Sequence, residues 1–430
     1  MKLKKFFIFL IIQILIINIS LITFASVEKP DLTAEAAILM DSSSDKILYS
    51  RNANEKMYPA STTKIMTAIL TLESCNLDDI VTVPYDAIVI VPSGYSVASL
   101  QAGEEVTVKQ LLQMTLVHSA NDAANVLAFY ISGSIEDFAV LMNNKVSDLG
   151  LENTHFTNPS GKHDENHYTT AYDLAKIMQY CMKNSTFRTL AGLKSCTIPA
   201  TNKYEERVFT TTNELLIVDN RDVASNYYYE YAIAGKTGYT TEAKNCLVSV
   251  SNKDDLELIS VVLSVGLYEN GLSGKFIESK ALFNYGYGNY TIKKLREKNA
   301  IATQIEIKNA TKDTKNLDLL IPDDITVLIN QENLDKDYEP EIEINDDLTA
   351  PIAQNQKIGK ITYEIEGITY SEDLIAANNV EKSGFSILAI QIVLAIFILF
   401  ILYKLLFGNK NNGNRLKGNK KNRKPKYIYK

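Results

Sequence analysis

A long apolar run near the C-terminus constrains this chain more than any other feature. Residues 385–407 contain only Gln391 and Lys404 as strong polar interruptions, and about 20 apolar residues suffice to cross the hydrocarbon core of a bilayer. The run therefore predicts a transmembrane helix. Residues 408–430 form a basic tail without acidic residues, which favours the cytoplasmic side. A nucleic-acid-binding tail is the weaker alternative, because membrane-flanking charge already accounts for these residues.

The N-terminus carries the pattern of a secretory signal peptide. Lysines among residues 1–5 precede an apolar stretch, 6–24, which ends at the small residue Ala25, and this order of segments is typical of a cleaved export signal. An uncleaved anchor is the alternative, because the stretch exceeds the usual apolar core of roughly 7–15 residues. We favour cleavage, with residues 1–25 as the signal peptide. The chain between the two ends is then exported.

Charge is distributed unevenly between the ends and the exported part. Outside the two ends, 31 Lys and Arg residues stand against 51 Asp and Glu, a net charge of −20. Such a surface repels polyanions, so duplex nucleic acid is excluded as a partner. The exported part, about 360 residues long, is large enough to bury a core in two domains.

Apolar patterns after the signal peptide predict an α+β arrangement, an antiparallel sheet covered by helices. The expected elements are a hairpin at 36–49, helices at 61–72 and 111–129, and strands at 231–234, 246–250 and 258–263. After about residue 290 the pattern changes to short alternating stretches separated by turn residues. We therefore predict a catalytic domain at 26–290 and a small all-β domain at 291–380, between the catalytic domain and the membrane.

Three short motifs point to an active-site serine enzyme. They are Ser61–Lys64, Ser119–Asn121 and Lys236–Gly238, the S-x-x-K, S-x-N and K-T-G set of enzymes that handle penicillin. Each motif alone is weak, and loose chance matches begin at Ser43, Ser74 and Lys382. The surrounding sequence separates the motifs from the chance matches. Ser43 falls in a predicted hairpin turn and the match at Lys382 directly precedes the apolar run, whereas Ser61–Lys64 begins a predicted helix and Lys236–Gly238 follows a predicted strand.

Residue spacing suggests how the serine is activated. Ser61 and Lys64 are three apart in the first turn of a predicted helix and share a face. A lysine takes the serine proton only if burial or a second cation lowers its pKa, and Lys236 is the candidate second cation. Ser119 would relay the proton to the leaving amine. The Asn121 amide would hold the substrate carbonyl and the lysine.

The K-T-G motif predicts a substrate-binding strand. Lys236 and Thr237 stand at the end of a predicted strand, where an extended peptide pairs with the edge while the ammonium and hydroxyl bind its terminal carboxylate. Gly238 allows close approach of the substrate backbone. The backbone N–H groups of Ser61 and Tyr239 are candidates for an oxyanion hole, in which one donor is typically worth about 3–4 kcal/mol.

The residues around these motifs resemble a known family. Tyr58–Ala68, His118–Ala124 and Ala234–Thr240 look like signatures of the low-molecular-mass penicillin-binding proteins that are D-alanyl-D-alanine carboxypeptidases, serine peptidase family S11. Phe156–Gly161 and Thr169–Ala175 also resemble that family. The similarity covers roughly the whole predicted catalytic domain, and the β-rich stretch resembles the family's small C-terminal domain.

The resemblance implies a fold and an activity. The fold would be a serine β-lactamase or penicillin-binding-protein-like sheet flanked by helices. The activity would be removal of the terminal D-alanine from peptidoglycan stem pentapeptides through an acyl-serine intermediate, in cell-wall synthesis and remodelling, without a cofactor or metal. β-Lactam antibiotics would acylate the same serine. One departure is that many relatives end in an amphipathic helix lying on the membrane, whereas this chain ends in a full span and would be a single-pass membrane protein.

Two other functions are weaker alternatives. A β-lactamase would need a glutamate base, but neither Glu152 nor Glu165 has an asparagine four residues on, the spacing expected from resemblance to class A enzymes. A β-lactam sensor would need a substantial cytoplasmic domain. The tail at 408–430 is short and its composition is typical of a disordered segment.

Several conspicuous residues are interpreted as structural. His163 and His167 are four apart, but the glutamate between them does not follow the first histidine as in a zinc-binding H-E-x-x-H helix, so a loop role is favoured over a metal site. His118 and His155 lack a partner pattern. Tyr227–Tyr229 is interpreted as packed aromatic surface, with a substrate platform as the alternative.

The cysteines leave two interpretations open. Cys75, Cys181, Cys196 and Cys246 contain no C-x-x-C pair, and four cysteines allow three pairings that a sequence does not separate. Export permits a disulfide, but buried free thiols are equally consistent with the pattern. The cysteines suggest no metal site.

Overall fold

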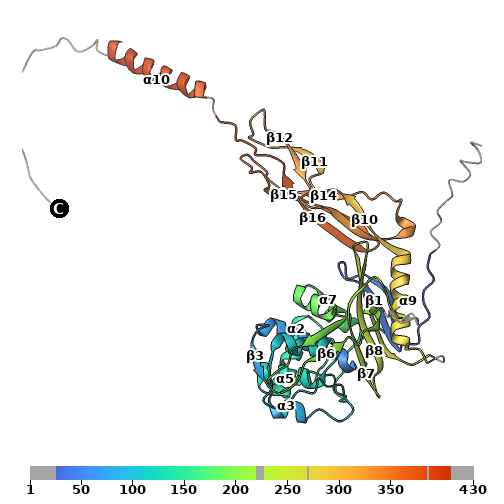
Figure 1. Cartoon of the computed structure of the whole chain (residues 1–430). Coiled ribbons are helices and arrows are strands. Elements are labelled where there is room, and N and C mark those ends of the chain that lie inside the picture. The colour runs from blue at the N-terminus through green and yellow to red at the C-terminus, as the bar shows by residue number, and fades with distance from the viewer. Residues whose placement is uncertain (1–25, 219–226, 269–270, 385–386, 408–430) are drawn as a thin grey trace, which may run out of the picture. The chain divides into compact units, whose positions relative to one another are not determined.

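A computed structural model describes residues 26–218, 227–268, 271–384 and 387–407 (Figure 1). The predicted signal peptide and basic tail lie outside these residues, so both remain predictions. The chain divides into two compact units, which are described separately. The first unit consists of the chain up to Leu295 together with residues 325–340 and 363–370. The second unit consists of residues 296–324, residues 341–362 and the chain from 371 onward.

An antiparallel sheet forms the centre of the first unit. Its strands are β1 (Ala36–Asp41), β2 (Ile47–Arg51), β7 (Ala232–Thr240), β8 (Lys244–Lys253) and β9 (Leu256–Val265), in the order β2-β1-β9-β8-β7. The predicted hairpin and returning strands are confirmed. Because β7 stands at the end of this order, one of its sides is free for pairing with another chain.

The inner strands β1 and β9 are buried on both faces, which explains why their residues are mostly apolar. In β1, Ile38 and Met40 join the core on one face, whereas Leu39 packs on the opposite face with Leu282 and Phe283 of α9 (Gly274–Asn289). Figure 1 shows α9 on one side of the sheet and α2, α5 and α7 on the other. The predicted arrangement of a sheet covered by helices is confirmed.

The remaining elements of the first unit cover this sheet or connect it. The helices are α2 (Lys64–Ser74), α3 (Tyr85–Val89), α4 (Val108–Leu116), α5 (Asn121–Ser132), α6 (Ile135–Asp148), α7 (Ala171–Met182), α8 (Ser185–Ala191) and the short turns η1 (Ala60–Thr63), η2 (Glu214–Leu216) and η3 (Gln331–Asn333). Two-stranded ladders join β3 (Ile80–Thr82) to β4 (Glu105–Thr107), β5 (Ser195–Ile198) to β6 (Arg207–Thr210) and β10 (Tyr290–Arg296) to β13 (Ile325–Asn330).

Two helices differ from their predicted course. The helix expected over 111–129 is interrupted between α4 and α5, because Ser119 has a φ of 62°, a left-handed conformation that a right-handed helix does not accommodate. Ser61, expected in the first turn of an α-helix, lies in the tighter 3₁₀ turn η1 just before α2. Both differences fall at the motif serines.

The second unit is all-β up to its last helix, which confirms the predicted small C-terminal β domain. Its five-stranded sheet has the order β11-β12-β16-β15-β14. Leu317 and Leu319 alternate with more exposed residues in β12 and are fully buried, as expected for a strand with one face on a core. The strands are β11 (Ile301–Glu306), β12 (Asn316–Leu320), β14 (Glu341–Ile344), β15 (Lys357–Ile365) and β16 (Ile368–Ala376).

The apolar run forms the helix α10 (Ile387–Phe407). Residues 389–407 have a mean hydropathy of 2.6 and none of that stretch is buried inside the protein. At about 1.5 Å per residue such a helix approaches the ~30 Å thickness of a hydrocarbon core. By length and composition α10 is therefore suited to cross a membrane.

Candidate active site

The turn that carries Ser61 is shaped by two glycines from distant segments. Gly161 has a φ of 78°, and a Cβ atom added to it would lie 1.8 Å from the Ala60 carbonyl oxygen. A Cβ on Gly238 would lie 3.1 Å from the Ser61 backbone nitrogen and 2.9 Å from the Pro59 carbonyl oxygen. Only glycine permits both approaches. The backbone of Ser61 is thus enclosed by β7 on one side and by the loop of Gly161 on the other.

Lys64 is completely buried behind Ser61. Its Nζ lies 2.8 Å from Ser61 Oγ, 2.9 Å from Asn121 Oδ1 and 2.6 Å from the Ser160 carbonyl oxygen. Burial, with the Lys236 ammonium as a second cause, lowers the pKa of Lys64 well below its ordinary value, against the opposing charge of Asp122.

These three contacts determine what a neutral Lys64 does. The Ser160 carbonyl and Asn121 Oδ1 only accept hydrogen bonds, whereas a hydroxyl both donates and accepts. A neutral amine therefore donates its two hydrogens to Ser160 and Asn121 and directs its lone pair at the Ser61 hydroxyl. The arrangement supports a general base at the serine.

Ser119 and Lys236 form the second polar pair. The Lys236 ammonium is buried and donates to Ser119 Oγ at 2.9 Å and to the Thr237 carbonyl at 2.8 Å. Burial, and next the charge of Lys275, lower the pKa of Lys236 to about 7. Lys236 thus lies behind Ser119, at the inner end of the site.

Asn121 connects the serine–lysine pair to the loop between α3 and β4, which carries Ser96. Its Oδ1 accepts from Lys64, and its Nδ2 donates to the Ser96 carbonyl at 2.8 Å. An amide nitrogen has two hydrogens, and among the described residues this is its one recorded bond, so one hydrogen is available to a substrate. The Ser96 carbonyl also accepts from the Asn121 backbone N–H at 2.8 Å, which fixes the start of α5.

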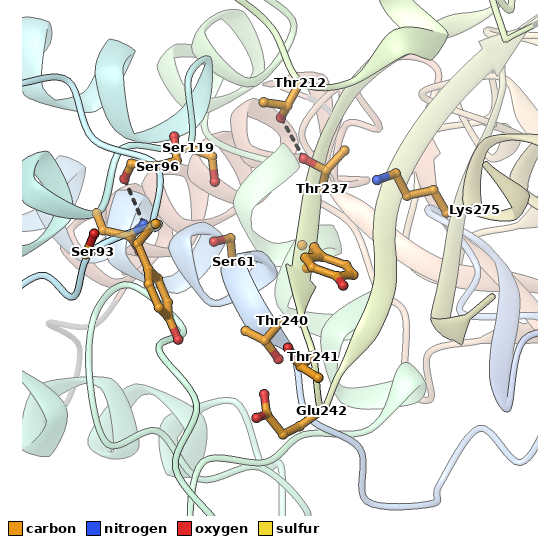
Figure 2. A pocket seen from close by; sticks show the side chains of 15 residues that line it. Ser61, Ser93, Ser96, Ser119, Thr212, Thr237, Thr240, Thr241, Glu242 and Lys275 are labelled. Carbon is orange, nitrogen blue, oxygen red and sulfur yellow. Dashed lines mark hydrogen bonds between the residues drawn. The ribbon is translucent and has the colours of Figure 1, made fainter. Parts of the chain in front are cut away.

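The motif residues meet at a cleft of about 520 Å³, shown in Figure 2. The lining residues come from η1, the loop between α3 and β4, the break between α4 and α5 with the first residue of α5, the loop after β6, β7 with the turn that follows it, and α9. The predicted site residues that line the cleft are Ser61, Ser119, Asn121, Thr237, Gly238 and Tyr239. Lys64 and Lys236 are not among the lining residues but support two of them, Ser61 and Ser119, from behind.

One end of the cleft offers groups suited to a carboxylate. The hydroxyls of Thr212 and Thr237 are 2.6 Å apart, and Lys275 lines the cleft near them (Figure 2). Lys275 Nζ donates to Asn245 Oδ1 at 3.2 Å. Burial lowers the pKa of Lys275, whose cation stands with these two hydroxyls at the surface of the cleft.

The sequence analysis did not identify four functional neighbours of these residues. Ser96, Thr212 and Lys275 line the cleft, and the Ser160 carbonyl binds Lys64. Ser160 lies within a stretch already recognised as similar to the family, which was an unused signal. Thr212 and Lys275 belong to no motif, and only the fold brings them to β7.

The residues interpreted as structural have structural contacts. His167 is buried; its Nδ1 accepts from the Thr157 backbone N–H at 3.1 Å and its Nε2 bonds the Thr63 hydroxyl at 2.8 Å. Burial lowers the pKa of His167 to about 3. Tyr229 stacks on Phe283, which supports packing for that tyrosine cluster.

All four cysteines lie within the described residues and are free thiols. Three of them, Cys181, Cys196 and Cys246, are buried, and burial raises the pKa of each. The interpretation as buried free thiols holds for these three, whereas Cys75 is partly exposed.

Two family models match the sequence. The model described as D-alanyl-D-alanine carboxypeptidase matches residues 23–266, and the model described as penicillin-binding protein 5, C-terminal domain, matches residues 290–382. The first match contains every residue that lines the cleft except Lys275.

Individual relatives extend over most of the chain. D-alanyl-D-alanine carboxypeptidase DacF of Bacillus subtilis is 30% identical over 394 residues, which is 87% of this chain and 95% of the relative. D-alanyl-D-alanine carboxypeptidase DacC of Escherichia coli is 32% identical and covers 84% of this chain and 87% of its own length. The solved structure of penicillin-binding protein 5 from Haemophilus influenzae has a TM-score of 0.65 at 29% identity and covers 83% of this chain and all of its own.

Proposed function

The chain belongs to the D-alanyl-D-alanine carboxypeptidase family, and on this premise we propose that Ser61 is the nucleophile with which it removes the terminal D-alanine from peptidoglycan stem pentapeptides. The observation that carries the proposal is the contact of Ser61 Oγ with a buried lysine whose two other partners are pure acceptors. That geometry gives the serine a base aimed at its proton.

Acylation follows from this geometry. Neutral Lys64 takes the Ser61 proton while Oγ bonds to the carbonyl carbon of the penultimate D-alanine. The oxyanion that forms is stabilised by the backbone N–H groups of Ser61 and Tyr239. Because Gly238 has no Cβ, the strand that carries Tyr239 can approach the Ser61 nitrogen closely. The bond from carbon to the nitrogen of the terminal D-alanine then breaks.

The departing nitrogen needs a proton, and Ser119 is placed to deliver it. Its hydroxyl accepts from Lys236, so the Ser119 proton is free to pass to the leaving amine while Lys236 resupplies the hydroxyl. Free D-alanine leaves. Before deacylation the proton that Lys64 took from Ser61 replaces the one that Lys236 passed to Ser119, so Lys64 is neutral again. A water molecule then gives a proton to Lys64 and bonds to the ester carbon. The bond from that carbon to Ser61 Oγ breaks, Oγ takes the proton back from Lys64, and the shortened peptide is released.

The terminal carboxylate of the substrate binds at the Thr237 end of the cleft. Lys236 was the cation first expected there, but its ammonium is committed inward to Ser119 and the Thr237 carbonyl. Lys275 and the hydroxyls of Thr212 and Thr237, which line the cleft, supply the donors instead. In this proposal Lys236 acts on the carboxylate only as a buried positive charge.

β-Lactams act on the same serine in this proposal. Their amide carbonyl takes the place of the penultimate D-alanine carbonyl and forms an ester with Ser61. Among the described residues that line the cleft, neither Glu152 nor Glu165 occurs, so the glutamate base that a β-lactamase would need for rapid drug hydrolysis is not supplied by these two. Long-lived acylation is therefore expected.

The location follows from the two ends of the chain. We propose that α10 spans the bacterial cell membrane once, with the basic tail in the cytoplasm and the catalytic domain on the cell-wall side. The apolarity of α10 supports the span. The proposed domain limits are 26–290 for the catalytic domain and 291–380 for the small β domain, and the two family models match residues 23–266 and 290–382.

Release of D-alanine tests the activity. Full-length protein in detergent is incubated with diacetyl-L-Lys-D-Ala-D-Ala, and free D-alanine is measured. We expect release by the native protein and by Ser43→Ala, whose hydroxyl bonds Asp41 in the β1–β2 turn, and no release by Ser61→Ala. Absence of release by the native protein, or release by Ser61→Ala at the native rate, would refute the proposal.

A further inference from the structure

The cleft carries opposite charges at its two ends. Lys275 lies at one end with Thr212 and Thr237, Glu242 lies at the other with Thr240 and Thr241, and Ser61 is between them (Figure 2). The proposed function uses the positive end for the substrate carboxylate. It assigns no role to the negative end.

Glu242 supplies the carboxylate at that negative end. It sits in the turn between β7 and β8 and is fully exposed to solvent. A hydrogen bond from its own backbone N–H, another from Thr240 and the nearby charge of His163 lower its pKa. These donors hold the carboxylate ionised, and none of them is a lysine or arginine that would neutralise it.

The direction of β7 sets which part of a substrate reaches Glu242. A peptide added to the free edge of β7 in antiparallel orientation, with its terminal carboxylate at Thr237, runs back toward Thr240. Each residue advances by about 3.3 Å along a strand. The two D-alanines therefore lie beside Thr237–Tyr239, and the residue that precedes them lies beside Thr240–Glu242.

We propose that Glu242 binds an ammonium group on the side chain of the residue that precedes D-Ala-D-Ala in the stem peptide. The substrate class is then the stem peptide whose cross-linking amine is still free, in preference to one whose amine is acylated. Tyr95 and Tyr239 also line the cleft, and aromatic faces attract cations. This inference rests on the proposed function of the same cleft.

Neighbouring charges are compatible with this assignment. Lys162, His163 and Asp164 line a second cleft that shares Tyr95 and Asn121 with the first. Of these three, His163 is the one whose charge acts on Glu242. Among the described residues that line the first cleft, Glu242 is the one acidic residue, so the end of the cleft near it favours a cation.

Two matched substrates test the inference. Nα-acetyl-L-Lys-D-Ala-D-Ala keeps a free side-chain ammonium, and diacetyl-L-Lys-D-Ala-D-Ala does not. We expect kcat/KM of the native full-length protein to be about two- to fivefold higher for the free amine, the range of an exposed ion pair, and to lose this preference in high salt. Glu242→Gln should bring the ratio to about one, and Glu242→Lys should reverse it.

The control is Glu165→Gln, which removes an exposed carboxylate that is not among the lining residues of either cleft and should keep the native ratio. A native ratio of one, or a preference that survives in Glu242→Gln, would overturn the inference while leaving the carboxypeptidase activity intact. Failure of the proposed function is distinguishable, because neither peptide would then release D-alanine.

Discussion

Replacing Gly161 by alanine is expected to slow acylation of Ser61 far more than it destabilises the fold. The added Cβ would lie 1.8 Å from the carbonyl oxygen of Ala60 and 2.9 Å from Thr63 Oγ1. Ala60 directly precedes the nucleophile, and its own φ is 47°. The backbone at this point therefore has few conformations with which to accommodate the methyl group.

The size of the effect follows from these distances. Real Cβ contacts are essentially never shorter than 3.0 Å, so the Ala60 carbonyl must move by about 1 Å, and a misplacement of that size costs about 100-fold in rate. The left-handed conformation of an alanine adds roughly 1–2 kcal/mol of strain. Gly150 has a φ of 68° and nothing within 4 Å of an added Cβ, so Gly150→Ala carries the strain alone.

The assay compares both variants. The second-order rate constant for acylation by a fluorescent penicillin reports the site, and the midpoint of thermal unfolding reports the fold. We expect Gly150→Ala to lower the midpoint and keep the native acylation rate, and Gly161→Ala to lose about two orders of magnitude in rate. Native-rate acylation of a folded Gly161→Ala protein would refute the proposed enclosure of the nucleophile turn.

Three further predictions concern buried titratable side chains. Lys236→Gln removes a cation that lowers the pKa of Lys64, so the acid limb of the acylation pH profile should move to higher pH, and an unmoved or lowered limb would contradict this pairing. Burial lowers the pKa of His167 from 6.5 to about 3, so between these two pH values the unfolded chain binds a proton that the folded protein does not. The free energy of unfolding should therefore fall as the pH decreases from 6.5 to about 3, and it should fall less steeply in His167→Gln. An equal dependence on pH in the two proteins would argue against a buried neutral His167. Arg207→Met leaves Glu104 buried without its ion-pair partner and should cost about 3–5 kcal/mol in denaturant unfolding, most of it recovered by adding Glu104→Gln; additive losses would exclude this explanation.

The sequence was sufficient for those parts of the site that depend on local spacing. Ser61 and Lys64 are three residues apart, and this separation brings their side chains within 2.8 Å even though the turn is 3₁₀ rather than α-helical. The strand at Lys236–Gly238 was recognised in part: the sequence analysis placed Lys236 and Thr237 at the end of a strand, whereas β7 continues through the motif to Thr240. Residue type and short-range geometry determine these contacts, so a pattern predicts them.

Long-range contacts were beyond such patterns. Ser160 acts through its backbone carbonyl, which accepts from Lys64, and Thr212 acts through its hydroxyl, which bonds that of Thr237. Both residues lie in loops that are far in sequence from their partners. The break before α5 depends on the left-handed Ser119, which hydrophobic periodicity does not reveal because apolar residues continue on both sides. Lys236 was expected to bind the substrate carboxylate, yet its ammonium points to the hydroxyl of Ser119, which lies in the break between α4 and α5.

Mass spectrometry of the full-length protein after exposure to benzylpenicillin tests the central proposal most directly. The account predicts one drug adduct, mapped to the peptide that contains Ser61, in the native protein and in Ser43→Ala, and no adduct in Ser61→Ala. An adduct that survives Ser61→Ala would contradict the assignment of the nucleophile.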